Sequence, residues 1–122
     1  MKSEYTLYHN PDCSKSRAAL ALLESNDISP EIIYYLEHPL SADQIRDLMA
    51  KLNITLSEML RSSEPEFDEY DLSDTTLSED LIMDIVVQHP NLIQRPILTH
   101  GGRAVIGRPP ENVLTLIEKA SS

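Results

Sequence analysis

Residues 8–17 read Tyr8-His9-Asn10-Pro11-Asp12-Cys13-Ser14-Lys15-Ser16-Arg17, and this stretch contains the single cysteine of the chain. The run before it, residues 5–8, is typical of a β-strand, and residues 17–26 after it are rich in strong helix formers. Pro11 fits poorly inside either element, so we expect the turn at Pro11 and the start of the helix near Cys13 or Ser14. The stretch therefore predicts a strand, a turn and a helix, with the cysteine at the start of the helix.

A thiol in this position is predicted to be reactive. A helix N-terminus carries roughly half an elementary positive charge, and its first N–H groups have no intrahelical partners. Both favour the thiolate, so we expect the pKa of Cys13 to lie below the value of about 8.5 of a free thiol. A lone cysteine is commonly a small buried side chain, but the polar neighbours of Cys13 argue against burial.

The composition is that of one globular domain over residues 1–122, with 41% hydrophobic and 25% charged residues. We find no signal pattern and no apolar run near the ~18 residues that span a bilayer, so we expect a cytoplasmic protein with no membrane partner. One unpaired cysteine fits a reducing compartment. The formal charge of −10 argues against a nucleic acid partner.

The first part of the chain predicts β-α-β, because residues 31–36 form a second apolar, β-branched run. Two strands joined by a short helix are expected to be parallel with a right-handed crossover. Ser41 is expected to cap a helix over residues 42–52. The next segment predicts a short helix over 56–60 and then a loop over 62–76, which has room for one helical turn around 66–70. Another helix is expected after Ser78, ending near His89. Residues 37–91 are therefore predicted to be a helical insertion.

The last part of the chain predicts β-β-α. Residues 97–99 and 103–106 flank His100-Gly101-Gly102, which is a hairpin signal. Pro109 or Pro110 is expected at the start of a final helix whose apolar side carries Val113, Leu114 and Ile117. The order β-α-β then β-β-α, with a reactive cysteine after the first strand, is typical of a thioredoxin-like α/β fold with a four-stranded mixed sheet. In that fold Pro96 would be a cis-proline facing the cysteine.

Other kinds of site have little support in the sequence. No histidine lies at metal-ligand spacing from another ligand, and we expect no metal site and no bound cofactor. Ten carboxylates lie between Glu58 and Asp84, where Arg61 is the only basic residue. This acidic run is either a solvated face or a surface for a basic partner, and the sequence does not decide between them.

The residue three positions after Cys13 is Ser16, so the chain has no Cys-x-x-Cys pair. If Cys13 passes through an oxidised state, a thiol from another molecule must reduce it. Arg61, Arg95 and Arg108 each lie beside a turn or a proline. A single arginine is most often a surface salt bridge, but a cluster near a thiolate would suit a tetrahedral oxyanion.

The motif His9-Asn10-Pro11-Asp12-Cys13-Ser14-Lys15-Ser16-Arg17, with Leu60-Arg61, Arg95-Pro96-Ile97 and Gly107-Arg108-Pro109, resembles the glutaredoxin-dependent arsenate reductase family. The resemblance implies that the thiol at position 13 attacks arsenate and releases water, that glutathione adds, that glutaredoxin removes the oxidised glutathione, and that arsenite leaves. It also implies an oxyanion triad and a histidine that helps to keep the thiol ionised. The implied catalytic residues are Cys13, Arg61, Arg95, Arg108 and His9, and the implied substrate-binding residues are Asn10, Ser14, Lys15, Ser16, Arg17 and Pro96.

Two other functions stay open at this point. One is a general glutathione-linked thiol oxidoreductase without arsenate specificity, against which the three arginines argue, because disulfide exchange needs no oxyanion site. The other is a non-enzymatic thioredoxin-like transcriptional regulator. Relatives of that kind commonly use a Cys-x-x-Cys switch, which Ser16 excludes here.

Overall fold

The computed structural model describes residues 5–121. The strands are β1 (Tyr5–Tyr8), β2 (Glu31–Ile33), β3 (Ile97–His100) and β4 (Arg103–Ile106). The α-helices are α1 (Ser14–Ser25), α2 (Ala42–Leu52), α3 (Pro65–Glu69), α4 (Glu79–Gln88) and α5 (Val113–Ser121). The 3₁₀ helices are η1 (Ser57–Met59), η2 (Pro90–Leu92) and η3 (Pro110–Asn112).

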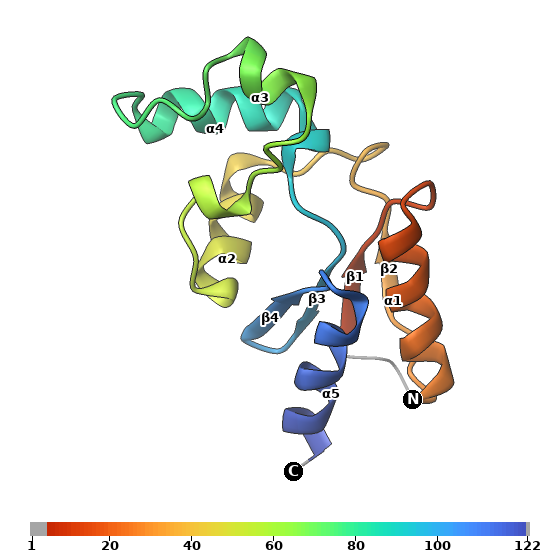
Figure 1. The fold of residues 1–122 in the computed structure, drawn as a ribbon. Coiled ribbons are helices and arrows are strands. Elements are labelled where there is room, and N and C mark those ends of the chain that lie inside the picture. The colour runs from red at the N-terminus through yellow and green to blue at the C-terminus, as the bar shows by residue number, and fades with distance from the viewer. Residues whose placement is uncertain (1–4, 122) are drawn as a thin grey trace. The chain divides into compact units, whose positions relative to one another are not determined.

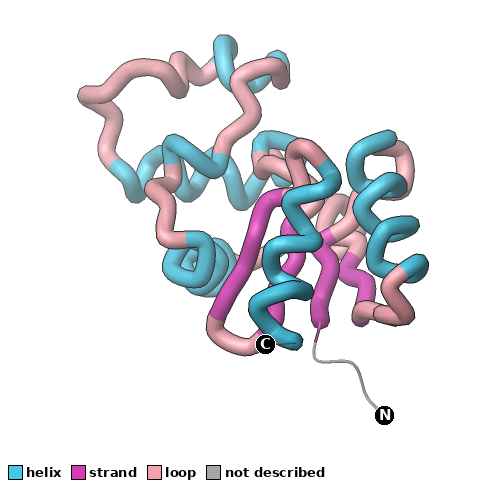
Figure 2. Tube along the Cα trace, turned by 60° about the horizontal axis from the view of Figure 1, so that its bottom comes forward, coloured by secondary structure: helices cyan, strands magenta, loops and turns pink. Residues whose placement is uncertain are grey.

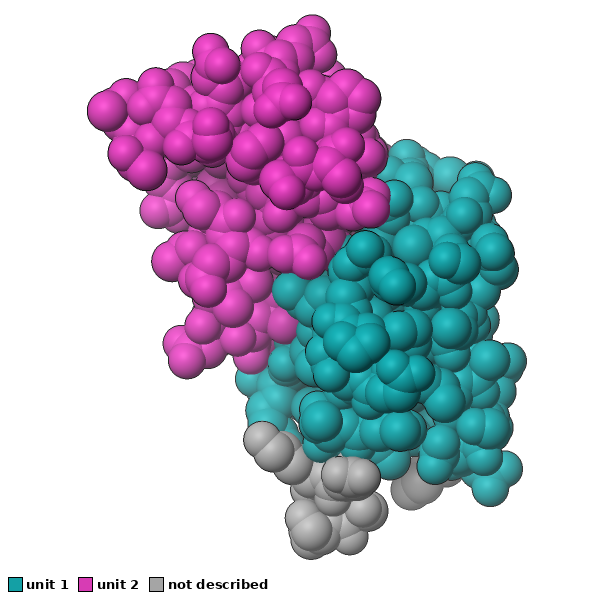
Figure 3. Space-filling view, viewed as in Figure 1, with its two compact units in different colours: residues 1–38, 95–122 teal, residues 39–94 magenta. Residues whose placement is uncertain are grey.

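The chain divides into two compact units, which Figure 3 colours separately. Unit 1 comprises Met1–His38 and Arg95–Ser122, and unit 2 comprises Pro39–Gln94. The helical insertion predicted over residues 37–91 covers nearly the same residues as unit 2. That residues 1–122 behave as one domain stays a prediction, and each unit is described by itself below.

Unit 1 contains the sheet, whose strand order is β2-β1-β3-β4 (Figure 1). Strand β1 pairs in parallel with β2, Leu7 lying opposite Ile32. It pairs antiparallel with β3, where Leu7 lies opposite Leu98, and β3 pairs antiparallel with β4. The predicted mixed four-stranded sheet with β-α-β and β-β-α halves is therefore confirmed.

The core of unit 1 lies between this sheet and two helices. Leu7 and Leu98 come from the central strands β1 and β3, and the helices α1 and α5 cover them with apolar side chains. Figure 2 shows α5, the helix that ends at the C label, against the strands. Burial of each such side chain contributes about 1.5–3 kcal/mol, so this face of the sheet anchors both helices. The fully or nearly buried members are Leu7, Ala19, Leu23, Leu98, Val113 and Leu116.

Three boundaries in unit 1 differ from the sequence prediction. Strand β2 ends at Ile33, not at residue 36, because the carbonyl of Tyr34 accepts hydrogen bonds from the N–H groups of Glu37 and His38 and turns the chain. His100 belongs to β3, and the hairpin turn is Gly101-Gly102, where Gly101 has a φ of 60°. Helix α5 begins after the prolines, which belong to η3 and the turn before it, and it buries Leu116 more deeply than Leu114.

In unit 2, the helices α2 and α4 begin at the predicted cap residues Ser41 and Ser78. Ser41 and Gln44 form a reciprocal capping box at the start of α2, and the Ser78 side chain accepts a hydrogen bond at the start of α4. Not every apolar residue of α4 is buried, since Leu81 is 47% exposed while Met83 is buried. No helix within residues 5–121 is long and apolar enough to cross a membrane.

Candidate functional site

Cys13 lies where strand β1 has ended and helix α1 begins, as the sequence predicted. It is the N-cap residue of α1, in an extended conformation with φ −95° and ψ 123°. Its N–H donates to the carbonyl of Asn10 at 3.0 Å, and its carbonyl accepts from the N–H of Arg17 at 3.0 Å. The thiol is half-buried and belongs to no disulfide. It is therefore held at the helix start and remains accessible.

Short-range hydrogen bonds set the shape of residues 9–17, which we call the Cys13 loop. The N–H of Asn10 donates to Ser16 Oγ at 3.2 Å, and the Asn10 side-chain oxygen accepts from the N–H of Asp12 at 3.0 Å. One guanidinium nitrogen of Arg17 donates to the carbonyl of Pro11 at 2.8 Å. Ser16 is fully buried and Asn10 is nearly so. Of the side chains predicted to bind substrate, those of Asn10, Ser16 and Arg17 thus make bonds that fix the loop.

Ser14 and Lys15 are placed differently, because both are exposed in the first turn of α1. Their backbone belongs to the helix start, where N–H groups have no intrahelical acceptors and where an anion is stabilised. An exposed ammonium and hydroxyl beside Cys13 in sequence are free to reach a solvent-borne anion. Their predicted part in substrate binding stays a prediction.

The environment of Cys13 lowers the pKa of its thiol. Partial burial would by itself raise this pKa, but hydrogen bonding from the backbone N–H groups of Ser16 and Lys15 lowers it. A side-chain hydrogen bond from Arg95 and the charge of its guanidinium lower it further, and together these effects outweigh burial. The lowered pKa expected from the helix start is thus found, and Arg95 adds a second cause.

His9 lies at the start of the Cys13 loop and is 4% exposed. Burial, and then the positive charge of Arg17, hold the pKa of its imidazole below the usual value, so the ring is neutral at pH 7. The ring contacts Tyr34 edge-on with centroids 6.0 Å apart, and its Nδ1 has no hydrogen-bond partner among the described residues. A neutral ring supplies no positive charge to the thiolate, so any help to Cys13 must come through hydrogen bonding.

Arg95, Pro96 and Arg108 come together in unit 1. The Arg95-Pro96 peptide bond is cis, as predicted, and the Arg108-Pro109 bond, which was not predicted to be cis, is cis as well. A guanidinium nitrogen of Arg108 donates to the carbonyl of Arg95 at 3.3 Å. Arg95 also bonds the thiol of Cys13, so Arg95 contacts Cys13 directly and Arg108 is connected to it through Arg95.

Gly107 and Asn112 hold this arrangement, and neither was predicted from the sequence to belong to the site. The N–H of Gly107 donates to the carbonyl of Pro96 at 2.8 Å, and a Cβ at position 107 would lie 2.8 Å from Pro96 Cγ. The side-chain amide of Asn112 donates to the carbonyl of Arg108 at 3.2 Å. The sequence shows a glycine at position 107, but only the structure shows that Pro96 leaves no room for a Cβ there.

Arg61 belongs to unit 2 and is described there by itself. Its N–H donates to the carbonyl of Leu92 at 2.7 Å, and Leu60 forms a β-bridge with Ile93. One guanidinium nitrogen of Arg61 lies 3.7 Å from Glu64 Oε1, and the two side chains are only 17% and 20% exposed. Its membership of an oxyanion triad stays a prediction.

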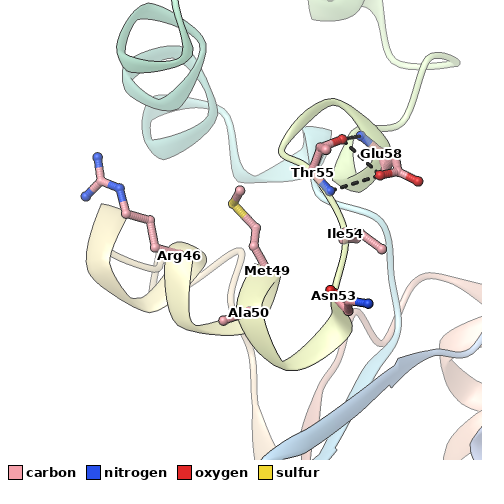
Figure 4. A pocket seen from close by; sticks show the side chains of 7 residues that line it. All are labelled: Arg46, Met49, Ala50, Asn53, Ile54, Thr55 and Glu58. Carbon is pink, nitrogen blue, oxygen red and sulfur yellow. Dashed lines mark hydrogen bonds between the residues drawn. The ribbon is translucent and has the colours of Figure 1, made fainter.

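Two further observations concern other kinds of site. Among residues 5–121 no three histidine, cysteine, aspartate or glutamate side chains are grouped to hold a metal ion. Unit 2 also has a surface pocket of about 410 Å³ between the C-terminal half of α2 and the segment that follows it (Figure 4). In it Glu58 is bonded to Thr55 by two hydrogen bonds of 3.0 Å.

Known proteins resemble this chain over nearly its whole length. A relative from Escherichia coli strain K12, the uncharacterized protein YfgD, is 42% identical over 96% of this chain and 99% of its own. An arsenate reductase of Neisseria meningitidis serogroup A is 38% identical over 90% of this chain and 95% of its own. The solved arsenate reductase from Vibrio cholerae has a TM-score of 0.88 at 43% identity, covering 91% of this chain and 95% of its own.

These likenesses confirm the thioredoxin-like fold and the resemblance read from the four motifs. The model of the ArsC family matches residues 8–116, which include the Cys13 loop and all three arginines. The chain therefore belongs to the ArsC family.

Proposed function

We propose that this protein reduces arsenate to arsenite, with Cys13 as the nucleophile and with glutathione and glutaredoxin as the reductants. The observation that carries the proposal is the half-buried thiol at the start of α1, whose pKa is lowered and which Arg95 contacts. Relatives named arsenate reductases at 38% identity support the choice of substrate.

The first step follows from the charge at the site. The Cys13 sulfur attacks arsenic, a sulfur–arsenic bond forms, and one arsenate oxygen leaves as water after taking up protons. Arsenate is a tetrahedral oxyanion, and arginine suits it because its planar fork can donate two parallel hydrogen bonds. The contact of Arg95 with the thiol supports this role for Arg95, and the hydrogen bond from Arg108 to the Arg95 carbonyl supports it for Arg108.

The remaining steps need electrons from outside the chain. Cys13 is the only cysteine in the sequence, so no second thiol of this chain can resolve the adduct. In the proposed cycle the thiol of glutathione adds to arsenic and a second water leaves. A glutaredoxin thiolate then attacks the glutathione sulfur, the electron pair of the sulfur–arsenic bond stays on arsenic, and arsenic(V) becomes arsenic(III). Water finally displaces arsenite from Cys13 and regenerates the thiol.

The experiment is a coupled assay with arsenate, glutathione, glutaredoxin, glutathione reductase and NADPH. We expect NADPH to be consumed only when arsenate, glutathione and this protein are all present, and Cys13→Ser to give no consumption above the background. Consumption with a disulfide substrate but not with arsenate would instead favour the general thiol oxidoreductase. Equal rates with thioredoxin and without glutathione would contradict the proposed order of reductants.

A further inference from the structure

A hydrogen-bonded network in unit 2 reaches the guanidinium of Arg61 through the carboxylate of Glu64. The side-chain amide of Asn91 donates to Glu64 Oε1 at 3.2 Å and to Glu66 Oε1 at 2.9 Å. The same Oε1 atom of Glu64 lies 3.7 Å from a guanidinium nitrogen of Arg61. Asn91 thus holds the carboxylate oxygen that faces Arg61.

The backbone brings the two parts of this network together. The N–H of Arg61 donates to the carbonyl of Leu92, the residue after Asn91, and Gln94 donates to the carbonyls of Met59 and Glu58. Helix α3 then carries Glu66, and the turn before it carries Glu64, whose N–H donates to the Arg61 carbonyl at 3.3 Å. Residues 27 positions apart in sequence, Glu64 and Asn91, are therefore held within hydrogen-bonding distance.

The far side of the network is also fixed. His89, which ends α4, has its Nε2 3.2 Å from the Tyr70 hydroxyl and its Nδ1 3.9 Å from Glu66. The hydrogen bond from Asn91 is also the main reason that the pKa of Glu66 lies below its usual value. Glu66 is therefore a charged carboxylate at neutral pH, which makes the hydrogen bond that it accepts from Asn91 stronger than a neutral one.

We propose that Asn91 is a positioning residue for Arg61: its amide fixes the carboxylate of Glu64, and that carboxylate holds the guanidinium in one orientation. The inference rests on the proposed function and on the predicted oxyanion triad, in which Arg61 would bind negative charge on the reacting arsenate. A long arginine side chain loses much rotamer freedom when it is ordered. A site acts best when such groups are held beforehand by neighbouring hydrogen bonds, not ordered during the reaction.

The test uses Asn91→Leu, which keeps the size of the side chain and removes both donors, in the wild-type and Arg61→Ala backgrounds. We expect kcat/KM for arsenate to fall about tenfold in the wild-type background, as for one lost hydrogen bond to a charged group. In the Arg61→Ala background the same substitution should change it less than about twofold, because the effect passes through Arg61. An equal loss in both backgrounds overturns the proposal and shows that Asn91 is merely structural.

Glu64→Gln provides a second variant, in case Asn91→Leu fails to fold, and Glu58→Gln is its control. The two glutamates lie three residues after and three before Arg61, and both changes remove one negative charge, but Glu58 is bonded to Thr55. We expect Glu64→Gln to lower kcat/KM only when Arg61 is present, and Glu58→Gln to leave it unchanged. A rise in kcat/KM in Glu64→Gln would mean that Glu64 shields Arg61 from the substrate, and would overturn the proposal.

Nitrogen-15 NMR of the guanidinium gives a readout that does not depend on turnover. A guanidinium held by Glu64 should show separate signals for its two terminal nitrogens, assigned by their loss in Arg61→Lys. We expect these signals to merge in Asn91→Leu and to stay separate in Glu58→Gln. If Arg61→Ala keeps full turnover, Arg61 has no part in the reaction. The NMR signals alone then support or overturn the proposal that Asn91 positions the Arg61 guanidinium.

Discussion

The Cys13 loop and the Arg61 segment (residues 58–61 paired with 92–94) are built in opposite ways. The side-chain hydrogen bonds within the Cys13 loop join residues at most six positions apart, such as Asn10 and Ser16. Arg61 is held by Leu92 through the backbone, and the neighbouring Glu58 and Gln94 are bonded across 36 positions. The shape of the Cys13 loop is therefore encoded locally, whereas the position of Arg61 depends on the folding of unit 2.

The largest effect should come from removing the reacting atom of Cys13, and a smaller effect from removing the guanidinium of Arg61. Cys13→Ser is expected to abolish arsenate turnover, since a hydroxyl at this position is a far weaker nucleophile. Arg61→Ala is expected to lower turnover by about a hundredfold, as for the loss of one oxyanion donor. The coupled assay measures turnover in both variants. Comparable turnover in the two would contradict this difference, because the reaction would then not depend on the Cys13 loop more than on Arg61.

The next effect separates Arg95 from Arg61 through the pKa of the thiol. Because Arg95 helps to lower the pKa of Cys13, Arg95→Ala should shift the pH profile of iodoacetamide alkylation to higher pH and lower turnover by about a hundredfold. The alkylation rate below the wild-type midpoint should fall, since less thiolate is present there. Arg61→Ala should leave the profile unchanged, and a shift in that variant would contradict the division of roles. Arg95→Lys should rescue turnover poorly, because an ammonium cannot form the bidentate contact.

A change at Gly107 tests the long-range packing within unit 1. A Cβ at this position would lie 2.8 Å from Pro96 Cγ and 3.2 Å from Val113 Cγ1. Gly107→Ala should therefore lower the free energy of unfolding by about 1–3 kcal/mol, as overpacking does. Gly102→Ala is the matched control, because nothing lies within 4 Å of a Cβ there, and urea unfolding of both variants gives the comparison. Equal stabilities would mean that the contact with Pro96 relaxes freely.

The smallest effect concerns the local bonds of the Cys13 loop. Ser16→Ala removes the oxygen that accepts from the N–H of Asn10, and it should lower the free energy of unfolding by about 1 kcal/mol. Ser25→Ala, which removes an exposed hydroxyl bonded to the Leu22 carbonyl, should change it by less than about 0.5 kcal/mol. If urea unfolding shows no difference between the two variants, the buried hydrogen bond contributes nothing measurable to the loop.

The sequence predicted those features that depend on neighbours along the chain. The turn at Pro11, the start of α1 after Cys13, and the capping box of Ser41 and Gln44 all follow from residues within a few positions of each other. The end of β2 was missed by three residues, because apolar runs do not show where a carbonyl such as that of Tyr34 will turn the chain. Leu81 of α4 is apolar but 47% exposed, because the sequence alone does not tell which apolar side chains find packing partners.

For the candidate site the same division holds. The sequence by itself determined a single cysteine at the start of a helix, the lack of a second thiol to resolve an adduct, and the presence of arginines beside turns and prolines. Only the tertiary structure decided that Arg95 contacts the thiol, that Arg108 bonds the Arg95 carbonyl, and that Asn91 holds Glu64 beside Arg61. The physical reason is that helix starts and caps are set by bonds within one turn of chain, whereas contacts between distant segments depend on how buried strands and helices pack.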